Sequence, residues 1–214
     1  LVQEEVLKDV LGKAYNEAVK EQGITPIITP RVHVDSFEDG TDLVFSADLC
    51  EAPEVKLGDY KDAVSKITAK SKIAIPGKEE VKPNVNEILD AVAASSTVEI
   101  PSVLYEQEAQ RLLSQTLDEL KSLGLTLEQY LNSRGKTSED MKKEAEDRAK
   151  KDLALEFVLR KIADTENITV EKTDVDEAMA GIQDPKQKEQ LLQNPYFLAS
   201  IIRQQKTLDF LSKI

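Results

Sequence analysis

The chain has 214 residues and a formal net charge of −12 at pH 7, with 32% charged and 40% hydrophobic residues. This length provides for one or two globular domains with a hydrophobic core, and the acidic balance argues against nucleic-acid binding through the overall field, because phosphates attract basic surfaces. The single cysteine excludes an intramolecular disulfide, no apolar run has the length of a membrane span, and the acidic N-terminal residues do not resemble a signal peptide.

The N-terminal segment predicts one helix followed by a β-hairpin. Residues 2–20 carry valine or alanine at every fourth position, which is the spacing of an amphipathic helix, and Gly23 is expected to end it. Residues 31–37 and 41–51 then alternate apolar and polar side chains, with a turn signal at 38–40. A lone hairpin is marginally stable in water, so we expect it to pack on the helix or on residues outside this chain.

The pattern weakens between the hairpin and the second half of the chain. Pro53 and Gly58 interrupt any regular element, and the residues that follow show only partial alternation. We predict an extended linker strap over residues 53–83, with short strands at most. It separates part of an N-terminal domain, residues 1–52, from a C-terminal domain, residues 84–214.

Beyond the strap the sequence predicts only helices. Asn84 and Thr137 are expected to cap helices, and Thr126 with Gln129 has the spacing of a capping box. Further helix starts and stops are predicted at Pro101, Gly124, Gly135, Thr173, Gly181, Pro185 and Pro195. The predicted fold class is therefore α+β, with an N-terminal helix and hairpin, an extended linker and a dominant all-helical C-terminal domain.

Residue types suited to catalysis are scarce. His33 is the only histidine and alternates outward on a predicted strand, and Cys50 lies beside Glu51 and Glu54, whose charges disfavour a thiolate. The sequence contains no phosphate-binding loop, dinucleotide-binding fingerprint or zinc-protease motif. We expect no catalytic residue, no metal and no cofactor in this chain.

The apolar helix faces are the remaining candidates for function. Most such faces are core, but an exposed apolar cluster marks a surface for another protein. Pro195 is predicted to start the closing helix, whose apolar arc is wider than one packing face, so either the whole arc is core or part of it is left for a partner. The predicted substrate-binding residues are Tyr196, Phe197, Ile201 and Ile202, with Leu112, Leu113 and Leu117 as further members.

Several blocks of the sequence resemble one family. The stretch APEVKLGDYKDAV, residues 52–64, looks like the strap of trigger factor, the ribosome-associated chaperone of bacteria. The blocks AYNEAVKEQGITPI and FEDGTDLVFSADLCEAPEV are similar to the second half of its N-terminal domain. The segment from VEIPSVLYEQEAQ to ADTENITV, and then NPYFLASIIRQQKTLDFL, resemble its C-terminal chaperone domain with its two arms.

The sequence also departs from the family pattern. The ribosome-docking loop, of the form GFRxGKxP, is expected before the first helix and is not in this sequence, so no ribosome-binding residue is carried over. Only residues 61–83 separate Tyr60 from the predicted helical domain, which is too short for the prolyl isomerase domain of the family. The resemblance therefore implies a trigger factor without isomerase, and we do not expect this chain to be an enzyme.

The resemblance implies an ATP-independent cytoplasmic chaperone that binds unfolded or nascent polypeptides in a helical cradle and assists folding, with export as a further role. No membrane or nucleic-acid partner is expected, the ribosome is a partner of the full-length family, and a homodimer is left open. Three alternatives remain: a periplasmic-type chaperone, an enzyme whose isomerase segment is missing here, and a helical scaffold for one folded partner.

Overall fold

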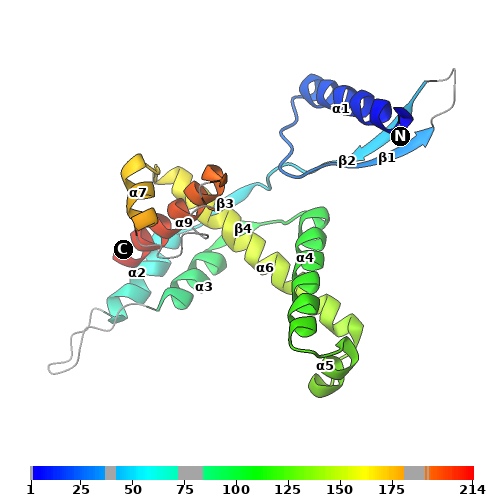
Figure 1. Ribbon diagram of the computed structural model, residues 1–214. Helices are drawn as coiled ribbons and strands as arrows, with labels where there is room; N and C mark the ends of the chain where they lie inside the picture. The colour runs from blue at the N-terminus through cyan, green and yellow to red at the C-terminus, as the bar shows by residue number, and fades with distance from the viewer. Residues whose placement is uncertain (1, 37–41, 72–83, 181–190, 192) are drawn as a thin grey trace. The chain divides into compact units, whose positions relative to one another are not determined.

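The computed structural model describes residues 2–36, 42–71, 84–180, 191 and 193–214 (Figure 1). The chain divides into two compact units, which we call unit 1 and unit 2. Unit 1 comprises Leu1–Pro53 and Pro101–Glu146, and unit 2 comprises Glu54–Ile100 and Asp147–Ile214. Helices dominate, and the described strands form two small antiparallel sheets, so the fold is α+β as predicted. Each unit joins segments distant in sequence, and the division into functional domains at 1–52, 53–83 and 84–214 stays a prediction.

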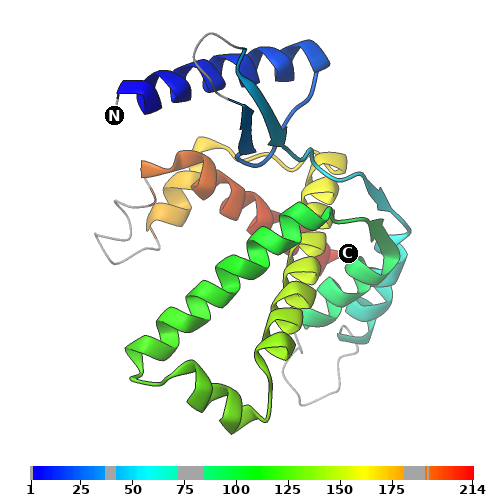
Figure 2. The ribbon, with the colours of Figure 1, turned by 90° about the vertical axis from the view of Figure 1, so that its right-hand side faces the viewer.

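The N-terminal part of unit 1 is a helix beside a hairpin (Figure 2). Helix α1 spans Val2–Gln22, and Gly23 follows it with φ 65°, a left-handed conformation that glycine adopts without strain. Strands β1, Arg31–Ser36, and β2, Val44–Asp48, pair antiparallel. The predicted helix and strands are therefore present, whereas the turn signal at 38–40 lies outside the described residues.

The second part of unit 1 contains helices whose ends follow local sequence signals. Helix α4 spans Ser102–Ser122, and Gly124 follows it with φ 70°. Helix α5 spans Leu127–Arg134 and has the predicted capping box, in which Thr126 and Gln129 each bond the backbone of the other. Helix α6, Ser138–Thr165, is continuous from unit 1 into unit 2, and its start is capped by the predicted Thr137, whose side chain accepts from the Asp140 amide at 3.1 Å.

Unit 2 has two elements that the sequence analysis did not predict. Helix α2 occupies Tyr60–Ser71, so the prediction of an extended strap is wrong there, and residues 72–83 lie outside the described part of the chain. The second unpredicted element is strand β4, Ser96–Val98, which lies within the region predicted to be all-helical. It pairs antiparallel with strand β3, Val55–Leu57. Helix α3, Val85–Ser95, begins at the predicted cap Asn84.

Packing explains why the strap residues become helical. Tyr60, Val64 and Thr68 recur at every fourth position and are buried on one face of α2. That face packs against α3 and α9, Pro195–Lys213, in the core of unit 2. The core cluster consists of Tyr60, Val64, Ile88, Val92, Val158, Leu159, Ile162 and Leu211, from α2, α3, α6 and α9. The row of Tyr60, Val64 and Thr68 is too short to predict a helix from the sequence alone, because the residues that cover it come from distant parts of the chain.

A polar contact joins the start of α2 to the end of α6. The Tyr60 hydroxyl donates a hydrogen bond to Oε1 of Glu166 at 2.6 Å, and Lys61 Nζ lies 2.7 Å from the same oxygen. The bonds from Lys61 and Tyr60 hold the pKa of Glu166 below its usual range, whereas burial and Glu166 raise the pKa of Tyr60. The ionised carboxylate therefore stabilises the folded state.

This contact predicts an acid-dependent loss of stability. A carboxyl group with a depressed folded pKa contributes stability above its unfolded pKa of about 4.3, and that contribution is lost as pH falls through the folded pKa. Glu166→Gln keeps an acceptor for Tyr60 but removes the charge, so it should lower stability at pH 7 and have progressively less effect below about pH 5. Urea unfolding across this pH range measures the difference. Glu177→Gln, at an exposed position of helix α7, Lys172–Ala180, is the control. An equal effect of Glu166→Gln at pH 7 and pH 3 would contradict the prediction.

Candidate functional site

Two local features place the first residues of α9. The side chain of Asn194 accepts a hydrogen bond from the Phe197 amide at 3.2 Å, and Pro195 occupies the first turn. Asparagine is a favoured cap, and proline at the first helical position loses no intrahelical bond. The predicted helix start is therefore confirmed, and Tyr196 and Phe197 lie in its first turn.

Three of the predicted binding residues form an exposed apolar surface on this helix. Tyr196 is 89% exposed, Phe197 is 53% exposed and Ile201 is 42% exposed. We call these residues the α9 surface. Phe197 and Ile201 are four residues apart and so project from the same side of the helix. Exposed apolar side chains grouped in this way are suited to binding another protein.

Ile202 does not belong to this surface, and its prediction as a binding residue on an exposed face is corrected. It is 7% exposed and packs with Leu198 against Met179 of helix α7, Lys172–Ala180. The physical reason is that successive helical residues are rotated by about 100°, so Ile202 faces α7 while Ile201 faces away from it. The apolar arc of α9 is thus divided between core and surface.

The other predicted residues lie in unit 1. Leu112, Leu113 and Leu117 are half-buried on α4, so they are neither core nor a strongly exposed patch. Two more exposed leucines, which were not among the predicted residues, follow α4: Leu123 is 71% exposed and Leu125 is 43% exposed. They lie on either side of Gly124, where the helix has ended. A leucine at such a position does not belong to an apolar helix face, and this could have indicated from the sequence that it is exposed.

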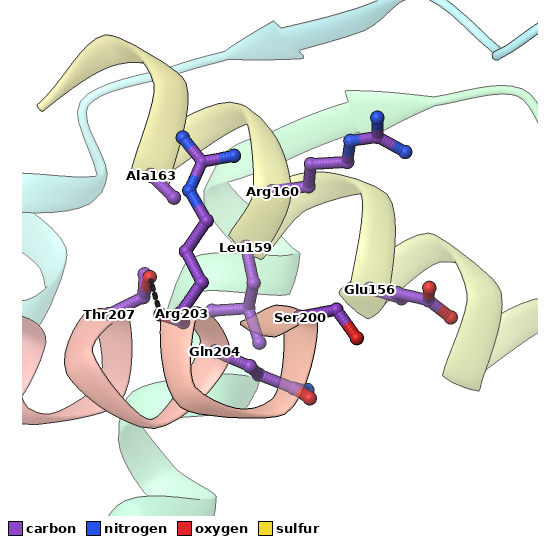
Figure 3. A pocket seen from close by; sticks show the side chains of 8 residues that line it. All are labelled: Glu156, Leu159, Arg160, Ala163, Ser200, Arg203, Gln204 and Thr207. Atoms are coloured by element: carbon purple, nitrogen blue, oxygen red, sulfur yellow. Dashed lines mark hydrogen bonds between the residues drawn. The ribbon is translucent and has the colours of Figure 1, made fainter. Parts of the chain in front are cut away.

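A pocket of about 280 Å³ lies between α6 and α9 in unit 2 (Figure 3). Each helix contributes four residues at i, i+3, i+4 and i+7, which is the spacing of one helix face. Leu159 and Ala163 are buried apolar residues, while Arg160 and Ser200 are exposed. The lining residues are Glu156, Leu159, Arg160, Ala163, Ser200, Arg203, Gln204 and Thr207. The pocket, which we call the α6–α9 pocket, combines an apolar floor with a polar rim.

The two arginines of the pocket differ in their partners. Arg203 is fixed by its Nη2, which lies 2.7 Å from Oδ1 of Asp164, and by its Nε, which donates to the carbonyl of Ile168 at 2.8 Å. Arg160 has no ion pair or side-chain hydrogen bond with any residue that the structure describes. Its guanidinium group is therefore available to a ligand, and a guanidinium is a strong donor to carboxylate and carbonyl oxygens.

The residues considered for catalysis do not form a reactive site. His33 lies on β1 opposite Ser46 and is exposed. Cys50 is buried and its thiol donates to the carbonyl of Glu51, and burial together with the Glu51 charge raises the pKa of this thiol. A raised pKa disfavours the nucleophilic thiolate. Within the described ranges no group of three histidine, cysteine, aspartate or glutamate residues could hold a metal ion.

Comparison with protein-family models gives two matches that together cover nearly the whole chain. The model described as "Bacterial trigger factor protein (TF) C-terminus" matches residues 64–213, and the one described as "Bacterial trigger factor protein (TF)" matches residues 2–88. The chain belongs to the trigger factor family. This confirms the family indicated by the sequence blocks.

Individual relatives carry the same family name. A trigger factor of Carboxydothermus hydrogenoformans is 29% identical over 228 residues, covering 94% of this chain and 53% of that protein. A trigger factor of Bacillus mycoides is 46% identical over 65 residues, covering 30% of this chain and 15% of that protein. The chain thus spans about half the length of the first relative and much less of the second.

One solved structure is similar at low identity. It comes from work on promiscuous substrate recognition in the folding and assembly activities of the trigger factor chaperone, and it covers 86% of this chain and 50% of its own, with 16% identity and a TM-score of 0.42. Separately, no helix among the described residues is both long and apolar enough to cross a membrane.

Proposed function

We propose that this chain is an ATP-independent chaperone that holds unfolded or nascent polypeptides at the α9 surface and thereby assists folding. The observation that carries the proposal is the division of α9, in which Leu198 and Ile202 are buried while Tyr196, Phe197 and Ile201 are exposed. Burying apolar surface is worth roughly 25 cal/mol per Å², so a non-native segment gains free energy by covering these side chains. Membership in the trigger factor family supports the same function.

The mechanism needs no nucleotide. Each exposed patch is small and binds weakly, but several patches that contact one flexible client add through effective concentration. Leu123 and Leu125 provide a second exposed apolar patch in unit 1, and the net charge of −12 helps to keep a chaperone–client complex soluble. A cytoplasmic location, a role in export, ribosome association of the full-length protein and a homodimer are further proposals that rest on the family alone.

Neighbouring isoleucines provide a matched test of the binding surface. Ile201→Ala and Ile202→Ala remove the same atoms one residue apart, but only the second removes them from a buried position. We expect Ile201→Ala to change stability by less than about 0.5 kcal/mol, whereas Ile202→Ala should cost about 2–5 kcal/mol. Urea unfolding of both variants measures these values.

The functional half of the test uses aggregation of a chemically unfolded client. A double variant, Phe197→Ala with Ile201→Ala, should require about fivefold more protein for half-maximal suppression, which corresponds to a loss of about 1 kcal/mol of binding. Val85→Ala, at an exposed position on α3, is the control and should suppress as the parent does. Unchanged suppression by the double variant would rule out the α9 surface as a client site.

The choice of clients separates a chaperone from a scaffold for one folded partner. A chaperone suppresses aggregation of several unrelated unfolded proteins and ignores the same proteins when folded. If the chain binds one folded protein and none of the unfolded ones, the scaffold alternative replaces the proposal.

A further inference from the structure

Helix α7 covers part of the apolar arc of α9. The arc is one continuous stripe, because residues four apart share a helix face and successive residues are rotated by about 100°. It consists of Phe197, Leu198, Ile201 and Ile202. Leu198 and Ile202 are 5% and 7% exposed because they pack against α7, which lies beside this part of α9 (Figure 1). If α7 moved away, two branched side chains would be added to the α9 surface.

The apolar contact that holds α7 in place is small. Among the residues that the structure describes, its one buried side chain is Met179, and the two other buried members of the cluster around it lie on α9. The main core of unit 2, in the same part of the chain, has eight buried members from four helices. A helix of nine residues is not stable in water by itself, so α7 depends on this contact to stay folded.

One ion pair adds to the apolar contact. Nζ of Lys206 on α9 lies 2.6 Å from Oδ2 of Asp174 on α7, and the same oxygen accepts a hydrogen bond from the Glu171 amide at 2.7 Å. The side chains of Lys206 and Asp174 are 37% and 23% exposed, and an ion pair in contact with water contributes little to stability. The contacts of α7 are therefore of a kind that a competing apolar segment can replace.

The elements on either side of α7 are fixed more firmly. The second half of α9 belongs to the main core through Leu211, so α9 keeps its place when α7 leaves. At the other end, the carbonyl of Ile168 accepts a hydrogen bond from Nε of Arg203 at 2.8 Å, which ties the residues after α6 to α9. Residues 169–171 have no regular secondary structure, so α7 can turn away at this point with the loss of few contacts.

We infer that α7 is a displaceable cover, and that an apolar segment of a client takes its place on Leu198 and Ile202. The client then covers the whole stripe of α9, and the apolar area that it buries offsets the contacts that α7 loses. Without a client, the cover keeps both side chains out of water and limits self-association of the chain. This inference rests on the proposed function and adds to it a way in which the client site is regulated.

Hydrogen exchange of the α7 amides tests the displacement. The 214-residue chain is placed in deuterated buffer with and without a saturating amount of a reduced and alkylated protein that stays unfolded, and peptides from α7 and α6 are analysed by mass spectrometry. Minor states are typically populated at about 0.1–10%, so displacement should speed exchange of the α7 amides at least about tenfold while the α6 amides stay protected. A client that binds beside a docked α7 would slow this exchange or leave it unchanged.

Asp174→Asn weakens the cover without changing the stripe on α9. It removes the charge that pairs with Lys206 and keeps a side-chain oxygen for the Glu171 amide. Loss of a partly exposed ion pair should make the α7 amides exchange about three- to fivefold faster without client. Because apparent affinity scales with the fraction of molecules that are open, the variant should suppress client aggregation at about three- to fivefold lower protein concentration.

Asp176→Asn is the control, since it makes the same change of charge at an exposed position of the same helix. It should exchange and suppress aggregation as the parent does. Urea unfolding confirms that both variants are folded. A purely structural role for Asp174 would lower stability and would not improve suppression.

Either of two results overturns the inference. Unchanged or slower exchange of the α7 amides with client shows that α7 stays docked. A requirement for as much Asp174→Asn protein as parent, or more, shows that the cover does not oppose binding. Both results leave suppression of aggregation by the parent intact and so leave the proposed function standing. If the parent itself does not suppress aggregation, the proposed function fails and the inference fails with it.

Discussion

Ile162→Ala is expected to lower the free energy of unfolding by about 2–5 kcal/mol. Ile162 on α6 is 0% exposed and belongs to the core cluster that α2, α3, α6 and α9 share in unit 2. Removing its branched side chain leaves a cavity, because residues held by four helices cannot all move to fill the space. Urea unfolding followed by far-UV circular dichroism measures the change.

A control variant shows whether the loss of stability comes from burial at position 162 or from replacing any isoleucine by alanine. Ile201→Ala on the exposed side of α9 is the matched control and should be nearly neutral. A free energy of unfolding for Ile162→Ala within about 0.5 kcal/mol of the parent value, with an unchanged denaturant dependence, would mean that this core does not hold unit 2 together.

Gly58→Ala is expected to cost about 1–3 kcal/mol through a steric overlap. Gly58 lies between β3 and α2, and its amide donates a hydrogen bond to the carbonyl of Ser95 at 3.0 Å. A Cβ at this position would lie 2.2 Å from that same carbonyl oxygen, so the two backbones have to separate and the hydrogen bond is strained. This close approach also explains why the strap sequence carries a glycine there.

A second glycine provides the control for this experiment. Gly12 lies within α1, and a Cβ built there meets no atom within 4 Å. Gly12→Ala should therefore be neutral or should stabilise the helix by about 0.5–1 kcal/mol, since glycine is a poor helix former. If Gly58→Ala and Gly12→Ala have the same free energy of unfolding in urea, the close approach of Gly58 to the Ser95 carbonyl is wrong.

The elements that could be predicted are those with local causes. The capping box at Thr126 and Gln129, the cap at Asn84 and the proline start of α9 each act through atoms within one helical turn. Their residue types and spacing therefore predict the helix ends without knowledge of the rest of the chain.

Elements with distant causes could not be predicted. Strand β4 exists because residues 96–98 pair with β3, some forty positions earlier, and three residues carry too little pattern to reveal a strand. Helix α2 has only a short apolar row, and its partners come from α3, α6 and α9. The α6–α9 pocket likewise forms only where two helices pack together. Nothing in the sequence therefore predicted that Arg160 and Arg203 line the same pocket.

The sequence by itself determined the α+β class and the existence of an apolar arc on α9, because caps and helical periodicity are properties of neighbouring residues. It indicated the family through blocks of residues that resemble trigger factor. The tertiary structure alone decided which side of that arc is core. Leu198 and Ile202 are as apolar as Phe197 and Ile201, and periodicity cannot rank them. Met179 on α7 covers the first pair and leaves the second exposed, so the position of a neighbouring helix separates packing residues from the candidate client-binding surface.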